Sequence, residues 1–166
     1  MRGLLAATRR IWIVGGWAPL AVFTAHVLLS QAFDAYALWP QTDTPMHFAG
    51  GLAIAFFVSR CFRALPRETV RSSRMVVLEL VLVGSLTATA ALFWELAEFG
   101  VDQLFGSNVQ VSLANTMKDL VLGMAGALTF LAARARQLRA SRREAWEIAG
   151  EWLAGRPAGA LHPPAA

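Results

Sequence analysis

The sequence predicts an all-α integral membrane protein, a bundle of four transmembrane helices with both ends of the chain in the cytoplasm. Of its 166 residues, 56% are hydrophobic and only 16% are charged, whereas an average soluble domain has about 25% charged residues. Four apolar segments come close to the ~20 residues that a helix needs to cross a bilayer. All fourteen arginines lie in three groups, which alternate along the chain with acidic loops.

The first expected span covers residues 11–33 and contains no charged side chain. Pro19 predicts a kink near its middle, because proline removes one helical hydrogen bond. A secretory signal peptide could look similar, since Arg9 and Arg10 precede the apolar stretch. However, the apolar core of a signal peptide is only about 7–15 residues long, so we interpret this segment as a retained membrane anchor.

The other three expected spans cover residues 46–62, 75–99 and 116–133. Residues 1–133 thus form the predicted transmembrane domain. Residues 134–154 are basic and have helical periodicity, which predicts an amphipathic cytoplasmic helix on the membrane surface, with Trp146 and Trp152 toward the lipid. The alternative is that they simply continue the fourth helix into water. Residues 155–166, rich in Pro, Gly and Ala, are predicted to be a disordered tail.

The arginines predict the orientation of the spans. They stand before the first span, around the second connection and after the fourth span: Arg2, Arg9 and Arg10; Arg60, Arg63, Arg67, Arg71 and Arg74; Arg134, Arg136, Arg139, Arg142, Arg143 and Arg156. The positive-inside rule places all three groups in the cytoplasm. Because these residues flank membrane spans and do not cover one soluble domain, we expect no nucleic-acid partner. The single cysteine, Cys61, excludes an internal disulfide and a cysteine-based metal site.

Ionisable residues gather at the predicted non-cytoplasmic ends of three spans, where such groups are costly and are candidates for function. In the third span, Glu95, Glu98 and Asp102 are spaced three and four apart, so they share one face of a helix. Three carboxylates there repel one another and need a proton, a cation or a basic partner. Glu95 is flanked by apolar residues, whereas Asp102 also fits a helix end that dips into water.

The second and fourth spans begin with similar polar groups. Asp43 and His47 open the second span, and Asn115, Lys118 and Asp119 open the fourth. Each has a plain structural alternative. Asp43 and Asn115 suit N-caps, and Asp119 suits the start of a helix, where the helix dipole favours an acidic group. His47 suits a hydrogen bond to a neighbouring span, and Lys118 suits a snorkelling position. Small residues follow in both spans and predict close contacts between helices: Gly50, Gly51, Gly123, Gly126 and Ala127.

Imidazole and carboxylate groups together suit two kinds of chemistry. They can hold a divalent metal such as Zn, Mn or Fe, and the candidate ligands are His47, Glu95, Glu98 and Asp119. They can also act as a general acid and base, with Glu95 and His47 as the candidate catalytic residues. The further candidate ligand-binding residues are Asp43, Glu98, Asp102, Asn115, Lys118 and Asp119. No dense metal motif such as H-E-x-x-H is present.

The order of these motifs resembles the VanZ-like membrane proteins, and more closely their YjdF-type relatives. The motifs are Asp43-x-x-x-His47-Phe48, Trp94-Glu95-x-x-Glu98 and Asn115-Thr116-x-x-Asp119-Leu120, followed by Gly123 and Gly126-Ala127, and they cover about residues 43–127. VanZ-like proteins commonly have Glu-x-x-Gln and an arginine in the next loop, whereas here the pair is Glu95/Glu98 and no arginine lies between Glu98 and Asn115. The resemblance implies a multi-pass protein of the bacterial cytoplasmic membrane. VanZ-like members are associated with glycopeptide-antibiotic resistance, but the resemblance implies no particular reaction.

Three functions remain open at this point. The first is an envelope protein whose outward-facing pocket, with or without a divalent metal, binds or acts on a lipid or an envelope precursor. The second is a small transporter or a proton or cation relay. Against a continuous path, the third span offers only Ser85, Thr87 and Thr89 between residues 81 and 92. The third is a non-catalytic membrane scaffold. Membrane lipid is the expected partner, with a second copy of the chain or another membrane protein as further candidates.

Overall fold

The structure is a computed structural model, described here for residues 8–64 and 73–153. These residues form helices and turns and contain no strand. Four helical segments are long and apolar enough to cross a membrane: Thr8–Gln31, Pro40–Arg63, Met75–Phe105 and Leu113–Ala140. The prediction of an all-α protein with four candidate spans is therefore confirmed. The chain divides into two units, residues 1–131 and 132–166, and the bundle belongs to the first.

The first span is interrupted at Gly15, where a short π-helix η1 (Trp12–Gly16) meets helix α2 (Trp17–Gln31). Gly15 has φ 116°, a conformation that favours glycine, and a Cβ there would lie 2.8 Å from the ring of Phe56. The guanidinium of Arg60 donates to the carbonyl oxygens of Ile13 and Val14, at 3.3 Å each. The kink predicted at Pro19 is thus wrong, because Pro19 lies in the first turn of α2, where no helical N–H is needed.

The connection after α2 forms two short helices, α3 (Ala35–Leu38) and η2 (Pro40–Thr42), which lead into α4 (Asp43–Arg63). The second span therefore starts before the expected residue 46. The residue that precedes α4 is Thr42, and it makes no capping hydrogen bond with its side chain. Asp43 is already inside the first helical turn, so the alternative that assigned it to an N-cap is wrong and its carboxylate is available for other contacts.

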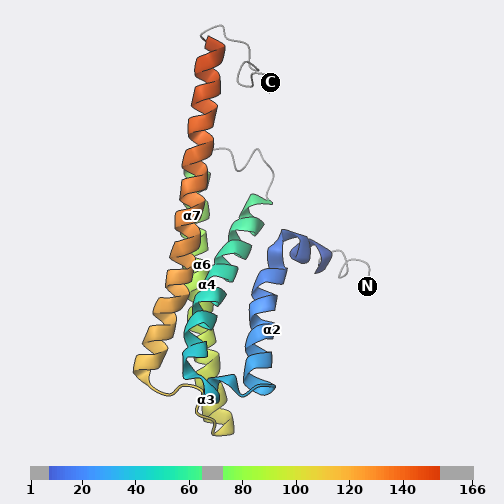
Figure 1. Cartoon of the computed structure of the whole chain (residues 1–166), viewed down its shortest axis with the longest axis vertical. Coiled ribbons are helices and arrows are strands. Elements are labelled where there is room, and N and C mark those ends of the chain that lie inside the picture. The colour runs from blue at the N-terminus through green and yellow to red at the C-terminus, as the bar shows by residue number, and fades with distance from the viewer. Residues whose placement is uncertain (1–7, 65–72, 154–166) are drawn as a thin grey trace, which may run out of the picture. The chain divides into compact units, whose positions relative to one another are not determined.

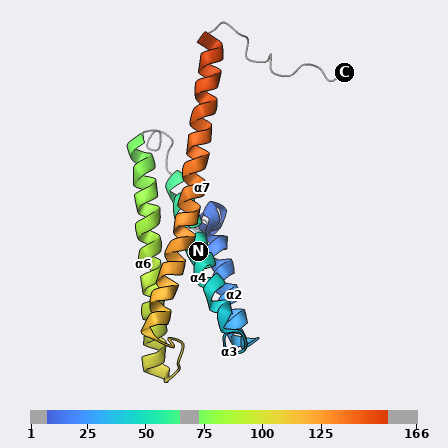
Figure 2. The ribbon, with the colours of Figure 1, turned by 60° about the vertical axis from the view of Figure 1, so that its left-hand side comes forward.

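Helix α4 lies at the centre of the bundle and contacts both α2 and α6 (Ser73–Phe105). The first part of α7 (Leu113–Leu153) runs beside α4 and α6, as Figures 1 and 2 show. The glycines explain how closely α7 approaches α4. A Cβ on Gly51 would overlap the carbonyl oxygen of Gly123, and a Cβ on Gly126 would overlap that of Phe48. Gly50 behaves differently, since a Cβ there meets no atom within 4 Å.

The seam between α4, α6 and α7 is built from residues four apart, one per helical turn. On α4 these are His47, Gly51, Ala55 and Ser59, on α6 they are Glu79, Val83, Thr87, Ala91 and Glu95, and on α7 they are Asp119, Gly123 and Ala127. Ala55, Val83 and Ala127 form the buried apolar middle. At one end of the seam the hydroxyl of Ser59 donates to the carboxylate of Glu79 at 2.6 Å, and both residues are buried.

Large apolar side chains lie mostly on the outside of the helices. Phe93, Val121 and Leu128 are each at least 60% exposed. This arrangement suits a bilayer, because lipid tails solvate such side chains and helices then associate through small residues. The small core and the apolar exterior are therefore two aspects of the same membrane fold.

Helix α7 continues without a break to Leu153. Residues 134–153 are thus helical, as both interpretations of this segment expected. Their location on the membrane surface stays a prediction. The side chains of Trp146 and Trp152 and the tail of residues 155–166 lie outside the part of the chain that the structure describes.

Candidate functional site

The candidate site lies at the end of the bundle that contains α3. The alternating direction of the spans brings the C-terminal ends of α2 and α6 to this end, together with the start of α4 and α7 (Figure 1). Five charged or titratable residues from α4, α6 and α7 meet there, and we call them the His47 cluster: Asp43, His47, Glu95, Lys118 and Asp119. The predicted convergence of His47, Glu95 and Asp119 is therefore found in the structure.

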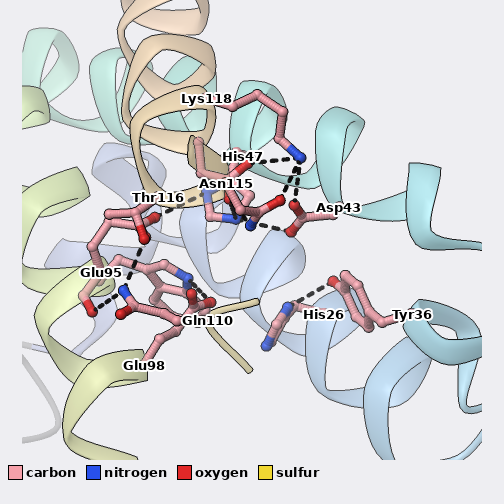
Figure 3. Close-up of polar contacts among 12 residues, drawn as sticks. His26, Tyr36, Asp43, His47, Glu95, Glu98, Gln110, Asn115, Thr116 and Lys118 are labelled. Carbon is pink, nitrogen blue, oxygen red and sulfur yellow. Dashed lines mark hydrogen bonds and ion pairs between the residues drawn. The ribbon is translucent and has the colours of Figure 1, made fainter. Parts of the chain in front are cut away.

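His47 is the centre of this cluster, because both of its ring nitrogens face carboxylates (Figure 3). Its Nε2 lies 3.0 Å from Oδ1 of Asp43, one turn earlier on α4, and 3.9 Å from Oδ2 of Asp119. Its Nδ1 lies 3.7 Å from Oε1 of Glu95. The side chain of His47 is 12% exposed, so these groups interact largely out of contact with water.

Asp119 is the most deeply buried carboxylate of the cluster, with 1% of the residue exposed. Its Oδ2 accepts a hydrogen bond from the side-chain amide of Asn115. Its Oδ1 accepts no hydrogen bond from any residue that the structure describes. Lys118 Nζ lies 3.4 Å from this oxygen, which is longer than the ~2.7–2.9 Å of a charge-assisted hydrogen bond. Asn115 is inside α7, so it supports Asp119 and does not act as the expected N-cap.

Lys118 is the only cation of the cluster that does not depend on the protonation of histidine. Its Nζ lies 3.1 Å from Oδ2 of Asp43 and 3.0 Å from Oδ1 of Asn115. The side chain is 42% exposed, so its ammonium reaches the carboxylates from the solvent side. It neutralises part of the charge of Asp43 and Asp119.

Glu95 is held in place by the loop between α6 and α7. The side-chain amide of Gln110 donates to the main-chain oxygen of Glu95 at 2.8 Å and to Oε2 at 3.3 Å. Asp102 in turn accepts hydrogen bonds from the main-chain N–H of Val109 and Gln110 and from the hydroxyl of Ser107. Gln110 thus supports the site, although it was not among the predicted site residues; the sequence predicted only that it lies on the same side of the membrane as they do.

Glu98 and Asp102 do not join the cluster. Glu98 accepts a hydrogen bond from Nε1 of Trp94 at 2.7 Å, and it forms no ion pair with the cluster among the described residues. Asp102 orders the loop of Gln110, as described above. The structure therefore separates Glu98 from the expected metal ligands and gives Asp102 a supporting place.

An apolar cavity of about 240 Å³ adjoins the cluster, and His47 lines both. His26 of α2 lies on the same cavity, and its Nδ1 shares a 2.7 Å hydrogen bond with the hydroxyl of Tyr36 (Figure 3). Burial, and to a smaller extent the charges of Asp43 and Glu98, raise the pKa of Tyr36 to about 12. Neither His26 nor Tyr36 was among the predicted site residues. The position of His26 in a span without charged residues could have indicated that His26 belongs to a site.

A family model described as "Predicted membrane protein (DUF2238)" matches residues 3–140. The chain belongs to this family. The match includes all four candidate spans and the whole His47 cluster. No curated protein and no solved structure matches the chain. The family description agrees with the expected multi-pass membrane protein.

In this DUF2238 protein, three ligand atoms suit a metal ion. Asp43, His47 and Asp119 each offer one such atom, and these atoms lie within 4.8 Å of one another. Histidine nitrogen and carboxylate oxygen are both ligands of zinc. A metal-bound histidine usually donates its other ring N–H to a carboxylate or carbonyl. Oε1 of Glu95 lies on that side of the His47 ring, but at 3.7 Å from Nδ1 it is beyond hydrogen-bond distance. This set includes Asp43, which the sequence interpretation did not name as a metal ligand, and it leaves out Glu95 and Glu98, which the sequence interpretation did name.

Proposed function

We propose that this DUF2238 protein is a multi-pass protein of the bacterial cytoplasmic membrane whose His47 cluster binds a divalent cation and, beside it, a lipid or an envelope precursor. The grouping of the arginines supports an orientation with both termini in the cytoplasm, so that the cluster faces the outside. The likeness of the motifs to VanZ-like and YjdF-type proteins supports a role in the bacterial envelope. Both arguments are independent of the geometry of the cluster.

The observation that carries the cation site is Oδ1 of Asp119. It is buried and accepts no hydrogen bond among the described residues. Buried polar atoms are nearly always satisfied, and leaving one without a partner costs about 1–3 kcal/mol. Its nearest charged neighbour is the ammonium of Lys118, 3.4 Å away. A divalent cation held by Asp119, His47 and Asp43 would give the Asp119 carboxylate a closer positive partner.

The charge of the cluster also favours a cation. Asp43, Glu95 and Asp119 carry up to three negative charges, while Lys118 supplies one positive charge. Two unit charges 4 Å apart repel by about 4 kcal/mol at an effective dielectric constant of about 20. A divalent ion removes this repulsion without requiring a proton on a carboxylate.

The test is to measure the metal content and the metal response of the full-length protein in detergent. We expect about one Zn²⁺ or Mn²⁺ per chain by elemental analysis, and a melting temperature that rises on addition of the metal and falls on chelation. A ligand at 100 times its Kd stabilises the native state by about 2.7 kcal/mol. The variant Asp119→Asn should lose the metal. Asp34→Asn is the matched control, because Asp34 is an exposed carboxylate with φ 47°, a conformation that asparagine tolerates.

Equal metal content in wild type and Asp119→Asn, or no metal in either, would contradict the cation site. Retention of metal by Asp34→Asn is needed to show that the loss is specific to the cluster. Loss of metal from both variants would indicate non-specific binding to surface carboxylates.

A proton relay is the second candidate, because a histidine between two carboxylates can accept a proton at one ring nitrogen and release one at the other. His47 has Asp43 at Nε2 and Glu95 at Nδ1. The hydroxyls of Ser85, Thr87 and Thr89 bond to carbonyls of their own helix, which weighs against a continuous path. A pH-sensitive dye inside proteoliposomes tests this function. A relay predicts proton influx that His47→Gln abolishes and that chelators leave unchanged.

A further inference from the structure

The lining residues and the location of the cavity beside His47 indicate which kind of molecule it binds. It lies between α2, α4 and α6, in the half of the bundle that contains the cluster, and its wall is mostly apolar. Among the lining residues are Val22, Phe23, Ile54 and Ala90. An apolar cavity does not hold ordered water well, and an empty one forfeits the packing contacts of its wall. An apolar ligand resolves both problems.

The cavity also opens to the surface of the bundle. Phe23 lines it and is 50% exposed, so one wall reaches the outside of α2. In a chain with four membrane-spanning helices, the molecules at that surface are lipids. Gly50 lines the interior, and a Cβ there meets no atom within 4 Å. The space above Gly50 is therefore free for a guest.

Polar groups occur at the cluster side of the cavity. His47 belongs to both the cavity and the cluster. His26 uses Nδ1 for Tyr36, and its Nε2 forms no hydrogen bond with the described residues. The ring of His26 packs edge-on against Trp94, with centroids 5.0 Å apart, so its position is fixed. A guest with an apolar chain and a polar head can use both parts of the site.

We propose that the cavity binds one acyl chain of a membrane phospholipid, whose phosphate lies at the His47 cluster. The volume is below the ~300–1,000 Å³ of pockets that enclose a whole small molecule, so it fits a segment of one chain and not a complete lipid. The placement of the phosphate rests on the proposed cation site, because a phosphate beside the carboxylates alone would be repelled. The chain-binding cavity does not depend on the cation.

The experiment fills the cavity with a larger side chain and measures how many phospholipid molecules remain bound to the protein. The full-length protein is reconstituted in vesicles of phosphatidylethanolamine and phosphatidylglycerol, extracted into detergent and analysed by native mass spectrometry. We expect one phospholipid per wild-type chain and at least a fivefold loss in Gly50→Leu. The matched control is Gly100→Leu: Gly100 is also helical with open space at its Cβ, but it does not line the cavity. It should retain the lipid.

Two further measurements distinguish loss of lipid binding from a folding defect and from loss of the cation. Ala90→Leu fills the same cavity from α6 and should also lose the lipid, so a folding defect of Gly50→Leu does not end the test. Metal content is measured in the same samples: Gly50→Leu should keep its cation, because Gly50 is not a ligand. Retained lipid in both filled variants, or none in the wild type, would overturn the chain site. Lipid binding that persists in Asp119→Asn at wild-type strength would refute only the phosphate placement.

A competition experiment tests whether the bound lipid chain belongs to a phospholipid or to an isoprenoid lipid. Addition of a polyprenyl phosphate to the vesicles should leave the bound phospholipid in place. If the polyprenyl phosphate replaces it, the site prefers an isoprenoid chain, and the assignment to a phospholipid is wrong.

Discussion

Gly51 of α4 lies directly against the main chain of Gly123 of α7, so that a Cβ on Gly51 would overlap the Gly123 carbonyl oxygen. One helical turn away, on the same faces, His47 precedes Gly51 and Asp119 precedes Gly123. The glycine contact therefore sets the separation of the two helices where His47 Nε2 and Asp119 Oδ2 lie 3.9 Å apart. The packing of the bundle and the geometry of the candidate site depend on the same contact.

Gly51→Ala should consequently destabilise the protein and separate α4 from α7. Overpacking usually costs about 1–3 kcal/mol, and the atom in the way is main chain, which cannot rotate aside. We expect a lower melting temperature in detergent and weaker binding of a divalent cation. Gly50→Ala is the matched control, because its Cβ enters open space and alanine favours a helix by about 1 kcal/mol over glycine. Equal stability of the two variants would show that the helices do not make this contact.

Lys118→Gln should strengthen the binding of a divalent cation. The ammonium lies 3.1 Å from Asp43 and 3.4 Å from Asp119, so it competes with the cation for the same carboxylates. Because the side chain is 42% exposed, solvent screening reduces its effect, and we expect a gain of about tenfold, or ~1.4 kcal/mol. Calorimetric titration with Mn²⁺ measures it. Arg10→Gln, an exposed cation at the start of the first span, should leave the Kd unchanged, and an unchanged Kd in Lys118→Gln would argue against the proposed site.

Tyr36 should titrate well above an ordinary tyrosine. Its pKa is raised to about 12 by burial, then by Asp43 and Glu98, compared with about 10 in an unfolded chain. The neutral phenol therefore contributes stability that is fully present below pH 10 and is lost as the pH rises through about 12. Tyr36 is the only tyrosine, so phenolate absorbance at alkaline pH reports on it alone. Tyr36→Phe should lack the transition, and a midpoint near pH 10 in the folded protein would contradict the buried environment.

Reporter fusions should place both ends of the chain in the cytoplasm. Fusions after Arg67 and after residue 154 are expected to give cytoplasmic signals, and one near Asn108 an external signal, because all fourteen arginines lie in the groups predicted to be inside. Exchanging the reporters at each position provides the control, since the two signals should then reverse. An external signal at Arg67 would refute the orientation and place the His47 cluster on the cytoplasmic side.

The polar partners within the seam could be predicted only in part. Asp43 and His47 are one turn apart on one helix, so their contact follows from helical geometry alone. Glu95 and Glu98 are only about 60° apart around the same helix, and the rotation of α6 in the bundle decides that Glu95 faces His47 while Glu98 bonds to Trp94. The pair of Ser59 and Glu79 depends in the same way on the pairing of α4 with α6.

The four spans, the all-helical fold and the small residues of the close helix contacts could be predicted from the order of the amino acids alone. This is possible because each segment must by itself be long enough and apolar enough to cross the bilayer, and must satisfy its own main-chain hydrogen bonds. Three features became visible only in the folded protein: the first span breaks at Gly15 and not at Pro19, Gln110 supports Glu95, and His26 shares a cavity with His47. These features depend on which helices are neighbours and on their rotation, and a pattern along one chain segment contains neither.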